Sequence, residues 1–234
     1  MKDENMFFGF FTLTDLMLLI PAMVFAMYAQ YKVKSTFKKY NEVPSSRGMT
    51  GAQVATNVLR NNNIYDVEVE ETEGSLTDHY DPTSKKLRLS ESIYGSSSIA
   101  ALGVAAHEAG HAIQHNTGYS PLKMRHSFYP VANIGSNLAI PLFIVGLFMN
   151  SGILMDVGIW LFAGAVAFTV ITLPVEFNAS KRAMLQLESG GYLAGQELSS
   201  ARKVLNAAAL TYVASTAVAV MHLIRLLILR GDSE

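Results

Sequence analysis

Four long apolar runs constrain this chain more than any other feature of its sequence. They span about residues 6–28, 131–149, 153–175 and 204–229. Each is close to the roughly 20 residues that a helix needs to cross the hydrocarbon core of a bilayer. Only 16% of the 234 residues are charged, whereas soluble domains carry about a quarter. The sequence therefore predicts a multi-pass membrane protein with about four transmembrane helices.

The first run is expected to be an uncleaved span, because its apolar core is too long for a signal peptide and Asp3 and Glu4 interrupt the basic segment that would precede one. Basic residues near span ends concentrate on the cytoplasmic side. In this sequence, basic residues occur after the first run, before the second run, and between the third and fourth runs. They are Lys32, Lys34, Lys38, Lys39, Arg47, Lys123, Arg125, Lys181, Arg182, Arg202 and Lys203. The polar segments are therefore expected in the cytoplasm and both termini outside, although Arg225 and Arg230 depart from this bias.

The polar segments read as a mixture of helices and strands. Thr50 and Gln53 form a capping box that begins a helix, and the asparagines at 61–63 end it. Alternating residues predict strands at about 66–72 and 85–90. The expected fold class is α+β, mainly α. Its expected parts are a first span (1–30), a polar α+β segment (31–130), a transmembrane hairpin (131–175), a short helical segment (176–203) and a last span (204–234).

The chemistry is concentrated in a helix predicted over about residues 99–115, which contains His-Glu-Ala-Gly-His. His107 and His111 lie four residues apart, so their rings point the same way and can converge on one ion. Glu108 can accept the proton of a water that attacks a peptide carbonyl. Cysteine is absent from the sequence, which leaves His and carboxylates as the ligands. This motif predicts a zinc site with Glu108 as the general base.

Zinc needs a third protein ligand. His115 continues the i+4 series, but each step drifts by about 40°, which places His115 about 80° around from His107; a role beside a ligand or in the cleft is expected instead. Glu176 follows Pro174, where a helix start or kink is expected, and Ser180 would then share its face and hydrogen-bond a ligand. A carboxylate at the end of an apolar run is also a common interface anchor, so spacing leaves both roles of Glu176 open.

Two further features bear on a peptidase. The strand at 85–90 comes directly before the motif helix, where it is either an edge that pairs with an extended substrate or a covered strand. A group that stabilises the oxyanion is also expected, and the sequence does not choose among several candidates. These are Asn178, Arg182, Tyr212 and His222. Asn178 and Arg182 are also candidates to support a ligand or bind substrate.

From the motif helix to the stretch Leu-Pro-Val-Glu-Phe-Asn-Ala-Ser at 173–180, the chain resembles the YugP family of neutral zinc metallopeptidases. This bacterial membrane group is similar in pattern to the HtpX and CAAX prenyl protease branch of the gluzincins, and the resemblance covers nearly the whole chain. It implies a zincin-like domain in which His107, His111 and Glu176 bind one Zn²⁺ per chain and Glu108 is catalytic. The wider branch has Asp where this sequence has Ser180, so its carboxylate–histidine pairing is not expected here.

These inferences predict a zinc metalloendopeptidase of the bacterial plasma membrane that cuts protein or peptide substrates at the cytoplasmic face. The lipid bilayer is its other expected partner, and the net charge of −1 gives no basis for nucleic-acid binding. One alternative is an intramembrane site-2-type protease, which needs an aspartate ligand from a later span; Asp156 lies in a short outer loop. The other is a non-catalytic metal-binding membrane protein or transporter, for which His222 and Arg225 would suit a transport path.

Overall fold

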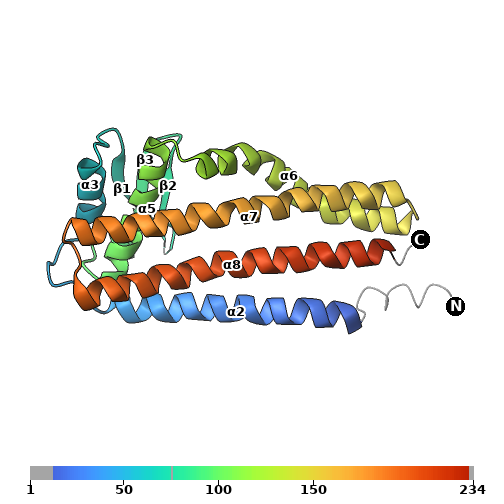
Figure 1. Ribbon diagram of the computed structural model, residues 1–234, viewed down its shortest axis with the longest axis horizontal. Coiled ribbons are helices and arrows are strands. Elements are labelled where there is room, and N and C mark those ends of the chain that lie inside the picture. The colour runs from blue at the N-terminus through green and yellow to red at the C-terminus, as the bar shows by residue number, and fades with distance from the viewer. Residues whose placement is uncertain (1–12, 75, 232–234) are drawn as a thin grey trace. The chain divides into compact units, whose positions relative to one another are not determined.

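The computed structural model describes residues 13–74 and 76–231, most of which are helical (Figure 1). The long helices in this part of the chain are α2 (Leu13–Asn41), α6 (Ser120–Phe148), α7 (Gly152–Ser189) and α8 (Gly195–Gly231). The shorter helices are α3 (Gly51–Asn61), α4 (Glu91–Tyr94) and α5 (Ile99–Asn116). The strands are β1 (Glu68–Thr72), β2 (His79–Asp81) and β3 (Lys86–Ser90).

The chain forms two compact units. The apolar unit comprises the described parts of Met1–Gln30, Arg125–Thr172 and Thr211–Glu234. The polar unit comprises the described parts of Tyr31–Met124 and Leu173–Leu210. Each of the four long helices therefore contributes residues to both units, and the polar unit is assembled from two separate stretches of sequence.

The long helices α2, α6, α7 and α8 are sufficiently long and apolar to cross a membrane. No other helix in the described part of the chain meets both criteria, so the number of candidate spans agrees with the four predicted from the sequence. Large apolar side chains on them are exposed, including Trp160 at 78% and Ile153 at 77%. Such a surface is stable against lipid rather than against water. The start of the first predicted span, with Asp3 and Glu4 before it, lies outside the described residues.

Glycines bring α6 and α7 close together within the apolar unit. A Cβ added at Gly158 would lie 2.7 Å from the carbonyl oxygen of Ala139, and one added at Gly146 would lie 2.7 Å from the amide nitrogen of Met155. Met155 is itself buried against Phe143 in the core of this unit. Small residues at helix contacts are typical of membrane proteins, where close van der Waals packing drives helix association. α6 and α7 therefore pack as a tight hairpin.

The sheet of the polar unit has the strand order β1-β3-β2. β3 pairs in parallel with β1 and antiparallel with β2, and its side chains Leu87 and Leu89 are completely buried. The segment at 85–90 is therefore a covered central strand, and the alternative that it forms a free edge for substrate is wrong. β2, which the sequence analysis did not predict, is one of the two edges of this sheet. Its three residues are too few to show an alternating pattern.

Local signals at the helix ends were mostly read correctly. The predicted capping box of Thr50 and Gln53 is present at the start of α3. The structure also has a cap at α5, where the Ser98 hydroxyl accepts from the amide of Ala101 (3.1 Å). Of the helix start or kink expected at Pro174, the start is wrong, because Pro174 lies inside α7. A proline removes one backbone hydrogen bond, and in a long, well-packed helix tertiary contacts outweigh that loss.

Candidate metal centre

Helix α5 holds the two motif histidines in a rigid, largely buried frame. Its small residues allow close packing, and Ala105 and Ala109 are completely buried. His107 and His111 lie one turn apart, with ring centroids separated by 4.8 Å and ring planes nearly perpendicular (88°). Both side chains are mostly buried, so their ring nitrogens are held in place by packing as well as by the helix.

Glu176 reaches the same point from α7. Its carboxylate is 2% exposed, with Oε2 lying 3.2 Å from Nε2 of His107 and 3.6 Å from Nε2 of His111. One ligand atom from each of the three residues lies within 4.8 Å of the others. Glu176 comes 69 positions after His107 along the chain, and the packing of α7 against α5 brings them together.

The spacing of these atoms suits zinc. A tetrahedral zinc ion with ligand bonds of about 2.0–2.1 Å holds its ligand atoms about 3.3 Å apart. The observed separations between the imidazole nitrogens and the carboxylate oxygen, 3.2 and 3.6 Å, bracket that value. Two imidazoles and one carboxylate also form a common ligand set of catalytic zinc sites, which leaves the fourth position for water or substrate.

The second ring nitrogen, Nδ1, of both His107 and His111 also has a hydrogen-bond partner. Nδ1 of His107 lies 3.1 Å from the hydroxyl of Ser180, and Nδ1 of His111 lies 3.0 Å from the side-chain oxygen of Gln114. Because the amide oxygen can only accept, it fixes the proton of His111 on Nδ1 and leaves Nε2 free as a ligand. Ser180 can do the same for His107, and its position is the one that the sequence analysis expected.

Gln114 is the functional candidate that sequence reasoning missed. It is completely buried, and its amide nitrogen donates to the carbonyl of Val175 (2.8 Å) and to the side-chain oxygen of Asn178 (3.0 Å). Asn178 also accepts from Nε of Arg182 at 2.8 Å. A single glutamine thus joins a histidine of α5 to the turn of α7 that carries Glu176. The available signal was its i+3 spacing from His111 in a helix of small residues.

The electrostatics of the centre favour a cation. Burial lowers the pKa of His111, but its contact with Glu176 and the charge of Glu108 raise the pKa by more, so it lies above the ordinary histidine value. The surroundings therefore stabilise positive charge between the two helices. A divalent metal ion supplies such a charge without protonating either ring.

Glu108 and His115 differ in their relation to this centre. Glu108 is 8% exposed and follows His107 directly on α5, and its charge acts on His111. His115 instead lies with Nδ1 2.8 Å from the hydroxyl of Tyr80 on β2, and it is not part of the three-residue cluster. His115 therefore lies apart from the three-residue cluster and contacts the edge strand β2.

The remaining candidates of the sequence analysis lie in different places. Asn178 and Arg182 belong to the hydrogen-bond network around Gln114 and lie near the three-residue cluster. Nε of Arg182 donates to the side-chain oxygen of Asn178. Tyr212 and His222 belong to the part of α8 in the apolar unit. Asp156, the ligand that an intramembrane protease would require, accepts instead from Nε of Arg230 at 2.8 Å.

Gly110 permits the close approach of α5 to α7. A Cβ added there would lie 2.7 Å from the carbonyl oxygen of Ala179, three residues after Glu176, and backbone atoms cannot yield without moving the helix. Gly110→Ala is therefore expected to separate the histidines from Glu176 at a cost of roughly 1–3 kcal/mol, which corresponds to a loss of about 5- to 150-fold in metal affinity if the whole cost falls on the metal-bound state. Zinc retained after dialysis against graded EDTA measures this effect.

Gly103→Ala is the matched control for this prediction. The same methyl group on the same helix would meet Cβ of Ala201 at 3.8 Å, which is an ordinary contact. Zinc retention in this variant should equal that of the unmodified protein. Equal retention in both alanine variants would show that the approach at Gly110 does not set the geometry of the centre.

The described fold and site define a helical membrane protein with two histidines and a buried glutamate placed for one metal ion. The family model described as "Putative neutral zinc metallopeptidase" matches residues 15–231. A curated relative from Bacillus subtilis (strain 168), named "Putative membrane protease YugP", is 48% identical over 219 residues, covering 93% of this chain and 97% of that protein. No solved structure matches the chain. The chain therefore belongs to this zinc metallopeptidase family, which confirms the resemblance to the YugP family found in the sequence.

Proposed function

We propose that the protein is a membrane-bound zinc endopeptidase that hydrolyses peptide bonds of protein or peptide substrates at the cytoplasmic face of the bacterial plasma membrane. The observation that carries this proposal is the convergence of His107, His111 and Glu176 on one point, with Glu108 directly after His107 on α5 and its charge acting on His111. The family description supports zinc as the metal and peptide hydrolysis as the reaction. The polar unit would then act as a zincin-like peptidase domain.

Each polar residue of the centre has a chemical task in this proposal. His107, His111 and Glu176 would hold one Zn²⁺, which supplies a Lewis acid that polarises the scissile carbonyl and lowers the pKa of water. Glu108 accepts the proton of the attacking water and passes it to the leaving amine. Ser180 and Gln114 keep both imidazoles oriented with Nε2 toward Glu176. Asn178 and Arg182 hold Gln114 in place.

Zinc content tests the ligand assignment directly. The protein purified in detergent should carry about one zinc ion per chain, and His107→Ala or His111→Ala should lose most of it, because zinc sites of this kind need all three protein ligands. Metal analysis by mass spectrometry gives the stoichiometry, and cleavage of casein by the same preparations gives the activity. Stoichiometric zinc in the double alanine variant would remove the basis of the proposal.

The cytoplasmic placement follows from the lysines and arginines that flank the predicted spans. Of the two residues that depart from this bias, Arg230 forms an ion pair with Asp156. The connection between α6 and α7 and the first turn of α7, residues 150–156, should therefore be outside the cell and the segment around Lys38 inside. The protein has no cysteine, so single cysteines can be placed at Ser151 and at Lys38 and labelled with an impermeant maleimide in whole cells.

The labelling experiment has opposite outcomes for the two orientations. Ser151→Cys should react in intact cells, whereas Lys38→Cys should react only after permeabilisation. The reverse pattern would place the metal centre outside the cytoplasm and would leave the peptidase chemistry untouched.

A further inference from the structure

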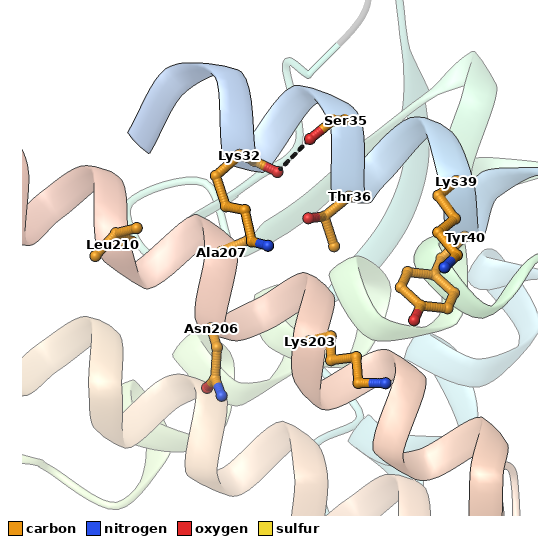
Figure 2. A pocket seen from close by; sticks show the side chains of 9 residues that line it. All are labelled: Lys32, Ser35, Thr36, Lys39, Tyr40, Lys203, Asn206, Ala207 and Leu210. Atoms are coloured by element: carbon orange, nitrogen blue, oxygen red, sulfur yellow. Dashed lines mark hydrogen bonds between the residues drawn. The ribbon is translucent and has the colours of Figure 1, made fainter. Parts of the chain in front are cut away.

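A cavity of about 570 Å³ lies between the last turns of α2 and the first half of α8 (Figure 2). Every residue that lines it belongs to the polar unit. The side chains that matter here are Lys32, Thr36, Lys39 and Tyr40 from α2, and Lys203 and Leu210 from α8. This groove is separate from the residues of the metal centre.

The groove is lined by positively charged side chains and by no acidic side chain. Three lysines line it and no Asp or Glu does. Within the described residues, none of the three ammonium groups forms an ion pair, whereas Lys85 and Lys86 in the same unit pair with Asp66 and Glu70. Like charges around one cavity repel each other, and an anion placed among them removes that cost. The groove is therefore built for an anionic ligand.

Its polar donors suit the oxygens of a phosphate group. Figure 2 shows the Thr36 hydroxyl near Lys32 on α2, with Tyr40 and Lys39 further along the same helix. The Tyr40 ring is 9% exposed, and Nζ of Lys39 lies 5.5 Å from its centroid. Ammonium and hydroxyl groups from two helices can thus donate to several oxygens of one phosphate, and such charge-assisted hydrogen bonds are among the strongest in proteins.

The position of the groove along α2 points to lipid as the source of that phosphate. The turns of α2 that precede Lys32 expose large apolar side chains, with Met17 at 67%, Met27 at 62% and Tyr31 at 71%. The change from exposed apolar to basic residues marks the level at which a helix leaves the hydrocarbon core and meets the headgroups. An acyl chain along the apolar surface of α2 would bring its phosphate to the groove.

We propose that this groove binds the phosphodiester headgroup of an anionic phospholipid. Lys32, Lys39 and Lys203 neutralise the phosphate, and Thr36 and Tyr40 donate to its oxygens. Tyr40 also packs with Ala100 in the first turn of α5, the helix that carries His107 and His111. A bound lipid therefore stabilises the packing of the motif helix as well as the ends of α2 and α8.

The test compares lipid binding by the full chain and two triple variants, purified in an uncharged detergent. Native mass spectrometry with phosphatidylglycerol and with phosphatidylcholine of the same acyl chains gives the two affinities. The unmodified protein should prefer phosphatidylglycerol by roughly tenfold or more, since each lysine near a membrane surface adds to the attraction for anionic lipid. Lys32→Gln/Lys39→Gln/Lys203→Gln should lose this preference, and its unfolding midpoint should no longer rise with phosphatidylglycerol.

The control removes the same charge from outside the groove. Lys34→Gln/Lys38→Gln/Lys123→Gln changes exposed residues of α2 and α6, and it should keep the preference. Equal loss in both triple variants, or no preference in the unmodified protein, would overturn the proposal. Stabilisation by millimolar inorganic phosphate but not by phosphatidylglycerol would also overturn it, because the groove would then serve a free anion. If the groove variant fails to fold, Lys32→Gln alone should still weaken phosphatidylglycerol binding severalfold. These measurements do not depend on peptidase activity.

Discussion

Replacing Glu108 with glutamine is expected to abolish peptide hydrolysis while leaving zinc in the centre. The amide preserves the size of a side chain that is only 8% exposed, but it cannot accept the proton of the attacking water. Loss of the general base should lower the rate by at least about 10²–10⁴-fold. Cleavage of casein and of a labelled peptide should be measured on the detergent-solubilised protein, with zinc determined on the same samples.

Glu91→Gln is the matched control, because it makes the same chemical change at an exposed position of α4 outside the centre. It should cleave at the rate of the unmodified protein. If Glu108→Gln also cleaved at that rate, the hydrolytic mechanism would have to be abandoned. Loss of zinc from Glu108→Gln would instead assign this residue to the ligand set.

Replacing Glu176 with glutamine is expected to release zinc, whereas His115→Ala should retain it. Glu176 supplies the carboxylate that faces both histidines, and the amide removes its charge from the site that we propose holds a dication. Loss of a residue that merely supports a ligand costs about 10–100-fold in affinity, so loss of a ligand should cost at least about 100-fold. His115 pairs with Tyr80, and its removal should alter that contact alone.

Both variants should be challenged with the same series of chelator concentrations, and residual zinc measured in each. Glu188→Gln, at an exposed position further along α7, controls for the general effect of removing a carboxylate from this helix. Zinc lost from His115→Ala but kept in Glu176→Gln would exchange the roles of the two residues. That result would also break the ligand pattern on which the proposed mechanism depends.

The sequence was most informative where function depends on local spacing. The i, i+4 separation of His107 and His111 follows from one helix, and four apolar runs of membrane length could be recognised without tertiary information. Glu176 is different, since nothing in its own neighbourhood separates a ligand from an interface anchor. The family resemblance favoured the ligand role, and the structure shows the carboxylate beside the two rings.

The features that escaped prediction depend on packing between distant segments. The i+3 spacing of Gln114 from His111 does not by itself indicate a function. Its role appears only when α7 supplies Val175 and Asn178 as partners. β2 is too short to be recognised alone, and it exists because β3 pairs with it. Pro174 suggested a helix start or a kink, but α7 continues through it without a new start.

The discontinuity of the polar unit has a consequence for biosynthesis. The ribosome makes the histidines first, and Glu176 follows 69 residues after His107, once the hairpin of α6 and α7 has been synthesised between them. A nascent chain that ends before the polar part of α7 holds two of the three proposed ligands and cannot close a zinc site of this kind. Completion of the centre would thus wait for synthesis of the whole hairpin, so that a partly made chain could not hydrolyse the proteins around it.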